Sequence, residues 1–135
     1  MQKKVVRAIS GAEYNAHTNE IYSKLEILKF DDIYKLYVSK FMLQYVKGEL
    51  PSPLLNIYTL SSHDQPHMTR HSLSLKFRPQ RRRTTLASNS ILHNGPLIWN
   101  SIPRQTYLNS NNNILYTSDG FVSRCKRVLL SDYGS

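Results

Sequence analysis

The amino-acid sequence predicts a mainly helical α+β fold, with a buried central helix, flanking short helices and a small antiparallel β element. The helix prediction comes from residues 32–47, which are apolar except for one narrow stripe of polar positions at helical spacing. The β element is indicated by residues 72–77, where apolar side chains recur at every second position. At 135 residues, 40% of them hydrophobic, the chain is long enough for a single domain over 1–135 with one modest core.

The first part of the predicted domain, residues 1–50, is helical. A helix is expected over 2–10, where the apolar residues share one side and Gly11 suits the end. A second short helix is expected over 19–28, with Asn19 as its N-cap.

The central helix is expected over 32–47 and ends before Gly48 and Pro51. Its polar positions form a single stripe that consists of Lys35, Ser39, Lys40, Gln44 and Lys47. Since a helix with so narrow a polar stripe is normally surrounded by other apolar elements, this helix is expected to be mostly buried.

A connection at 51–71 leads into a basic β and turn part at 72–104. This part is expected to hold a strand at 72–77 and a second extended segment at 84–93. The tripeptide Asn94-Gly95-Pro96 is typical of a turn.

The last part of the chain is expected to be an Asn-rich loop at 105–118 followed by a C-terminal helix at 119–131. Ser118 or Asp119 would cap this helix. Its apolar side includes Cys125, which at such a position usually acts as a small hydrophobic residue.

The charge of the chain is unevenly distributed. The formal net charge is +9, and residues 65–118 supply +7 of it, because they contain seven Lys or Arg and no Asp or Glu. A segment with one sign of charge favours a polyanionic partner, and improved solubility is the alternative explanation.

The best candidate for a binding site is a basic cluster within this acid-free segment. Arginine side chains can hold phosphate oxygens with two parallel hydrogen bonds. The predicted nucleic-acid-binding residues are Lys76, Arg78, Arg81, Arg82 and Arg83, with Arg70 at the margin. Phe77 lies among them and could stack on a base, although its alternating apolar neighbours favour a place in the core. A solvated surface or a nuclear targeting signal would explain the same basic run.

No catalytic residue, metal site or cofactor is predicted. The pair Asp31-Asp32 could hold magnesium in a polymerase, but its position before a helix favours a helix-capping role. His63, His67 and His71 recur every four residues, yet Pro66 interrupts the helix that would align them. Pairing of Cys125 with a histidine as a nucleophile is the weakest of these possibilities.

The sequence also predicts the cellular setting in broad terms. One cysteine allows no disulfide framework within the chain and no zinc site that needs two cysteines. No apolar run has the roughly 20 residues that cross a membrane, and no secretory signal is seen at the start. The protein is therefore expected to be intracellular, in the nucleus or the cytoplasm, and without a membrane partner.

Several stretches together form a recognisable pattern. The most specific are HTN at 17–19, LKFDDIY at 28–34 and GPLIWNSIP at 95–103, and Met68-Thr69-Arg70 lies between the last two. In order and spacing, over almost the whole chain, they resemble the region that follows the reverse transcriptase domain in polyproteins of non-LTR retrotransposons of the jockey and CR1-like kind.

The resemblance implies a parent protein that is an RNA-directed DNA polymerase, while the catalytic aspartates of that family lie upstream of the matching region. It therefore implies no enzyme activity for this chain. The expected function is accessory contact with the phosphate backbone of RNA or DNA, beside an upstream reverse transcriptase domain. Two alternatives remain. The chain could be a structural module that packs on the polymerase thumb, or a truncated copy with no selected function, as the departure from the family's lysine-rich last helix at 121–125 would fit.

Overall fold

The computed structural model describes residues 1–61, 75–108, 114 and 117–133. Over these residues the chain is mainly helical, with two short 3-10 helices named η1 (Ser52–Leu54) and η3 (Arg104–Thr106). The α-helices of the described part are α1 (Gln2–Ser10), α2 (Thr18–Lys24), α3 (Phe30–Lys47), α4 (Thr85–Ser88), α5 (Ile91–Ser101) and α6 (Ser118–Ser131). The predicted mainly helical character is thus confirmed.

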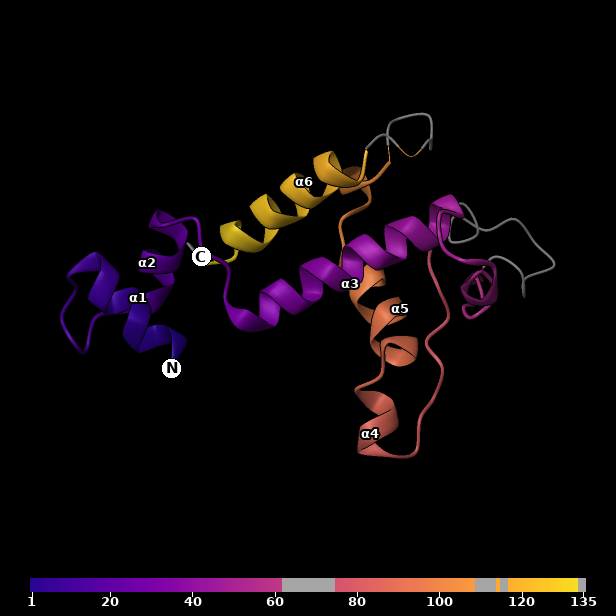
Figure 1. Ribbon diagram of the computed structural model, residues 1–135, viewed down its shortest axis with the longest axis horizontal. Helices are drawn as coiled ribbons and strands as arrows, with labels where there is room; N and C mark the ends of the chain where they lie inside the picture. The colour runs from indigo at the N-terminus through magenta and orange to yellow at the C-terminus, as the bar shows by residue number, and fades with distance from the viewer. Residues whose placement is uncertain (62–74, 109–113, 115–116, 134–135) are drawn as a thin grey trace.

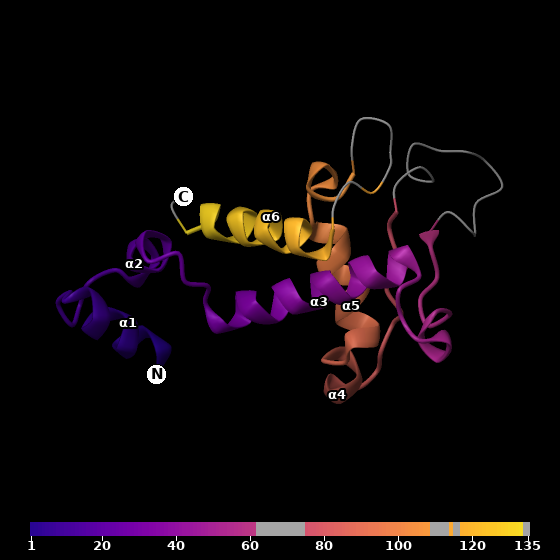
Figure 2. The same cartoon turned by 45° about the horizontal axis from the view of Figure 1, so that its top comes forward.

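Helix α3 is the central element, and the other helices are arranged along it. Figure 1 shows α6 running beside α3, α5 crossing α3 steeply, and α1 with α2 near the first end of α3. The turned view in Figure 2 shows the same arrangement, with α4 beyond the start of α5. The two ends of the central helix are therefore covered by different parts of the chain.

The larger of two hydrophobic cores lies where α3, α5 and α6 meet. Trp99 of α5 is at its centre and is fully buried. The Trp99 ring centroid is 4.7 Å from that of Tyr107, 6.0 Å from that of Phe121 and 6.4 Å from that of Phe77. These residues come from separate parts of the chain, so the tryptophan joins them into one core.

Helix α5 crosses α3 at Gly95, which corrects the predicted turn at Asn94-Gly95-Pro96. A Cβ atom at Gly95 would lie 2.7 Å from the Tyr58 hydroxyl oxygen and 3.0 Å from the Met42 sulfur, so a larger residue here would force these side chains to move. The Tyr58 hydroxyl also donates a 2.9 Å hydrogen bond to the carbonyl of Ile91. Close packing thus explains the glycine of a Gly-Pro pair, which local sequence rules assign to a turn.

A smaller core joins α1, α2 and the end of the chain. It contains Val6, Tyr22, Leu28 and Tyr133. The Tyr133 ring lies edge-on to Tyr22, with ring centroids 6.2 Å apart. Residues near opposite ends of the sequence therefore meet around the start of α3.

The start of α3 is capped by residues that are distant in sequence. Gln2 accepts a hydrogen bond from the Phe30 N–H at 3.0 Å and donates one to the Leu28 carbonyl at 3.0 Å. The Tyr133 hydroxyl accepts a hydrogen bond from the Lys29 N–H at 3.0 Å. These contacts satisfy backbone groups at a helix start that has no side-chain cap of its own.

The predicted β element is not present in the described residues. Phe77 forms an isolated antiparallel bridge with Leu60, and Leu108 forms another with Ile114, but neither extends into a ladder. The predicted strand at 72–77 is described only from Leu75 onward. Residues 75–78 do adopt an extended path, because side chains of α5 form hydrogen bonds with their backbone.

The predicted extended segment at 84–93 is wrong. This stretch contains α4 and the first residues of α5. The side-chain oxygen of Thr84 accepts a hydrogen bond from the Ala87 N–H at 3.2 Å and caps α4. The stretch has no acidic residue and no clear helical period, so its only local helix signals are cap residues such as Thr84 and Ser90.

The expectation that α3 is mostly buried is correct only for its second half. Phe30, Tyr34 and Tyr37 are 73%, 44% and 67% exposed, whereas Ser39 of the polar stripe is buried. Ser39 can be buried because its hydroxyl donates a 2.7 Å hydrogen bond to the Lys35 carbonyl. The polar stripe thus partly faces α6, while aromatic residues in the first half of α3 face outward.

The other helix predictions are largely confirmed. Helix α1 has the predicted bounds, and Gly11 ends it with a φ of 64°, a left-handed conformation that glycine adopts without strain. Helix α2 is shorter than predicted and begins after His17 instead of Asn19. The cap of α6 is Thr117, one residue before the predicted Ser118, and its hydroxyl accepts from the Gly120 N–H at 3.4 Å.

Candidate nucleic-acid interface

The basic segment, defined here as residues 75–83, lies between two parts of the chain, and its first four residues, 75–78, follow an extended path. On one side, the Ser61 N–H donates to the Lys76 carbonyl and the Arg78 N–H donates to the Thr59 carbonyl, both at 2.9 Å. These two hydrogen bonds flank the bridge between Leu60 and Phe77. They are the two hydrogen bonds of a single antiparallel bridge, which does not continue into a strand pair among the described residues.

On its other side, the basic segment is held by side chains of α5. The Asn100 amide donates to the Phe77 carbonyl at 2.7 Å, and its oxygen accepts from the Phe77 N–H at 3.0 Å. The Trp99 indole N–H donates to the Leu75 carbonyl at 2.7 Å. Asn100 satisfies the backbone groups that a second neighbouring strand would otherwise satisfy.

The extended conformation decides which way the side chains of the basic segment point. Phe77 is 1% exposed and belongs to the main core. Since successive side chains of an extended segment point to opposite sides, Lys76 and Arg78 point away from that core. Phe77 is therefore a core residue and does not offer its ring to a base.

The run of three arginines lies between two fixed points. Before it, the ring nitrogen Nδ1 of His93 donates to the Gln80 carbonyl at 2.7 Å, which attaches the segment to α5. After it, Thr84 begins α4. Arg81, Arg82 and Arg83 are exposed, and Arg82 also donates to the Gln80 side chain. Figure 1 shows the chain passing down beside α5 to reach α4.

The surroundings of these arginines suit an anion. Arg81 and Arg83 have no carboxylate partner among the described residues, and the ion pairs Lys35–Asp32 and Lys47–Glu49 lie at α3. A hollow of about 540 Å³ is lined by Thr59, Arg78, Pro79, Gln80 and Arg81. The predicted cluster from Lys76 to Arg83 is thus brought together on one anchored segment.

One predicted site residue, Arg70, lies outside the described residues, together with the rest of the Met68-Thr69-Arg70 stretch. The histidines His63, His67 and His71, which were considered as metal ligands and not predicted to be such, also lie outside them. Within the described part of the chain, no three His, Cys, Asp or Glu side chains gather closely enough to hold a metal ion. In the same part, no helix is both long enough and apolar enough to span a membrane.

The pair Asp31-Asp32 has a structural place at the first turn of α3. Asp32 is buried and accepts hydrogen bonds from the Lys35 ammonium at 2.8 Å and from the Tyr133 hydroxyl. Burial would raise the pKa of Asp32, but these hydrogen bonds and the nearby charge of Lys29 together lower it. Burial and the bond to Asp32 raise the pKa of Tyr133 to about 12.

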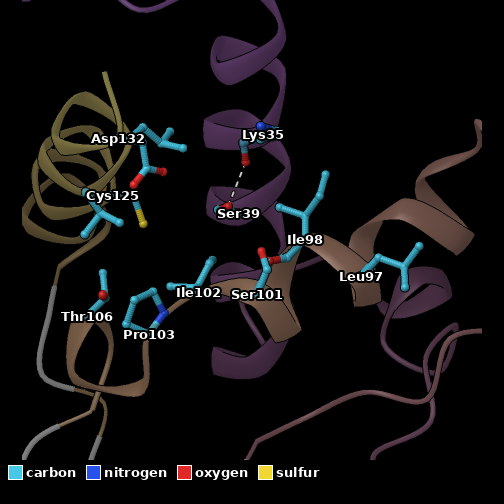
Figure 3. Close-up of a pocket in the computed structure, with 12 residues that line it drawn as sticks. Lys35, Ser39, Leu97, Ile98, Ser101, Ile102, Pro103, Thr106, Cys125 and Asp132 are labelled. Carbon is cyan, nitrogen blue, oxygen red and sulfur yellow. Dashed lines mark hydrogen bonds between the residues drawn. The ribbon is translucent and has the colours of Figure 1, made fainter. Parts of the chain in front are cut away.

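A groove of about 380 Å³ lies between α3, α5 and α6 (Figure 3). Its floor is mainly apolar, and Lys35, Ser39 and Asp132 lie along it. Cys125 also lines the groove, and burial raises the pKa of its thiol to about 12. The thiol is therefore protonated at neutral pH and lacks the thiolate character that a nucleophile needs.

Two residues that position the candidate interface, His93 and Asn100, were not assigned this role from the sequence. Asn100 follows the core tryptophan and precedes Ser101, and nothing in this local sequence distinguishes it as a residue that holds another segment. His93 gave no local signal, because its partner is a backbone carbonyl 13 residues earlier.

Comparison of the chain with family models, curated proteins and solved structures finds no match, so its function is argued from its own residues.

Proposed function

We propose that this chain is an accessory, non-catalytic region of a non-LTR retrotransposon reverse transcriptase polyprotein and contacts the phosphate backbone of RNA or DNA. The observation that carries the proposal is the anchored basic segment. Asn100, Trp99 and His93 hold its backbone from α5, while its basic side chains are directed away from the core. The resemblance of the sequence to that family supplies the wider context.

The contact is of a backbone type, without reading of base sequence. Arginine forks bind phosphate oxygens bidentately, and Lys76 adds a point charge at the start of the segment. Since Phe77 is buried in the core, this segment has no aromatic ring with which to stack on a base. Affinity should therefore depend strongly on salt and weakly on sequence.

The test is salt-dependent binding of the chain to single-stranded RNA and to duplex DNA. If about five phosphates are neutralised, log affinity should fall with log salt at a slope of roughly −3.5 for single strands and −4.5 for duplex. Replacing Arg81, Arg82 and Arg83 by alanine should reduce the magnitude of the slope by about 2 to 3, because each phosphate contact contributes about 0.7 to 0.9.

A matched control removes the same charge elsewhere. Lys3 and Lys4 of α1 and Lys24 of α2 are exposed, and their triple alanine variant also loses three positive charges. This variant should keep most of the salt dependence. The proposal fails if neither nucleic acid binds at low salt, or if the two triple variants behave alike.

A second candidate function is a structural module that docks on the upstream polymerase domain. The specific observation in its favour is the outward aromatic face of α3, formed by Phe30, Tyr34 and Tyr37. Aromatic residues are enriched at protein interfaces, where they bury a large area. The two candidate functions use different surfaces, so variants can separate them.

A further inference from the structure

A second basic surface lies on α6, apart from the basic segment. A hollow of about 420 Å³ opens between η3 and α6. Its polar lining consists of Gln105, Thr106, Arg124, Arg127 and Ser131. Two guanidinium groups, an amide and two hydroxyls therefore line one hollow, and no carboxylate is among its described lining residues.

The fold brings these groups together from two elements. Arg124 and Arg127 are three residues apart on α6 and so lie on neighbouring positions of one side of the helix. The other wall comes from η3, which packs against α6. The stacking of Tyr107 on Trp99, with ring centroids 4.7 Å apart, ties the end of η3 to the main core.

Among the described residues that line the hollow, none is acidic. The two carboxylates at the ends of α6 are Asp119 and Asp132, and neither lines the hollow. Asp132 lines the groove with Lys35 instead. Arg127 is exposed and has no carboxylate partner within the described residues. A lining of hydrogen-bond donors around positive charge is suited to an anion with several oxygens.

We propose that this hollow binds a phosphate group, held by the guanidinium groups of Arg124 and Arg127 and completed by the polar groups of η3. The phosphate can belong to a nucleic-acid backbone or to a free phosphate compound, and both present the same oxygens. The assignment does not depend on the function proposed for the basic segment, since either source would fill the hollow.

Titration of the isotopically labelled chain with pyrophosphate, followed by NMR shifts of backbone amides, tests the proposal directly. Pyrophosphate should shift the amides of η3 and of α6 around Arg127. Arg127→Ala should weaken binding about tenfold, the low end of what a charge-assisted hydrogen bond contributes. Lys126→Ala removes the same charge from the preceding residue, which does not line the hollow. This control should change the affinity for pyrophosphate by no more than about twofold.

A competition arm identifies the source of the phosphate. If Arg127→Ala also weakens single-stranded RNA binding and pyrophosphate displaces the RNA, the hollow holds a backbone phosphate. If RNA binding is unchanged while pyrophosphate binding is lost, the hollow serves a free phosphate compound. The variant with alanine at Arg81, Arg82 and Arg83 should keep pyrophosphate binding, which separates this proposal from the previous one. Unmoved η3 and α6 amides, or equal losses in the Arg127 and Lys126 variants, would overturn the assignment.

Discussion

At the scale of single residues, Asn100 is the side chain that makes the basic segment a defined surface. Its amide exchanges two hydrogen bonds with the backbone of Phe77, so one side chain replaces a length of strand. Loss of both bonds would leave the Phe77 N–H and carbonyl unsatisfied in the core, which is costly.

Asn100→Ala should therefore lower the free energy of unfolding by about 1–3 kcal/mol and speed hydrogen exchange of the Phe77 amide. Urea denaturation and exchange measured by NMR check both effects. Asn94→Ala, on the same helix, is the control, because Asn94 makes no such bond to the segment. Equal exchange rates in the two variants would show that Asn100 does not hold the segment.

At the scale of elements, the start of α3 shows how distant residues complete a helix. The helix has no side-chain cap from its own sequence, and Gln2 and Tyr133 satisfy the first backbone N–H groups instead. Tyr133 also donates to Asp32, whose carboxylate in addition accepts from Lys35. One hydrogen-bonded group thus connects the end of α6 to the first turn of α3.

This connection predicts a pH dependence of stability. Because the pKa of Asp32 is lower in the folded chain, its contribution is present above its unfolded pKa of about 3.9 and is lost as pH falls through the folded pKa. Asp32→Asn should cost about 1–2 kcal/mol at neutral pH, and the cost should shrink as the pH falls below the unfolded pKa of about 3.9. Urea midpoints from neutral pH down through the acid range measure this, and a cost that does not change with pH would contradict the role of the ionised carboxylate.

At the scale of the whole molecule, α3 and α6 connect two cores and leave one face of α3 uncovered. Phe121 and Cys125 of α6 belong to the main core, while Leu129 and Leu130 pack against the smaller one. The exposed aromatic face of α3 contributes to neither core, so it is available for a partner.

If the chain belongs to a reverse transcriptase polyprotein, as proposed, and this face docks on its polymerase domain, Tyr34→Ser with Tyr37→Ser should abolish binding of that domain supplied in trans. Stability should change by no more than about 0.5 kcal/mol per substitution, because both side chains are exposed. Tyr14→Ser removes an exposed tyrosine elsewhere and should not affect binding. Binding by the double variant at the level of the unmodified chain would exclude docking through this face.

The sequence by itself determined the helices whose signals are local. Gly11 and Gly48 end α1 and α3 in left-handed conformations, and the long apolar run of α3 marks the central helix. It also determined the charge, since the absence of acidic residues from 65 to 118 is a property of composition. Such features depend on residue type and spacing within a few helical turns, so they can be predicted without knowledge of the tertiary contacts.

Only the tertiary structure decided which residues position the basic segment and which face of α3 is buried. Gly95-Pro96 has the composition of a turn but lies within α5, where Met42 of α3 and Tyr58 approach Gly95 closely. Asn100, His93 and Tyr133 form hydrogen bonds with backbone groups that are distant in sequence, so no periodic pattern in the sequence predicts these bonds. The hollow on α6 likewise exists only because η3 is held beside it. Contacts between distant segments set these features, and local propensity does not contain that information.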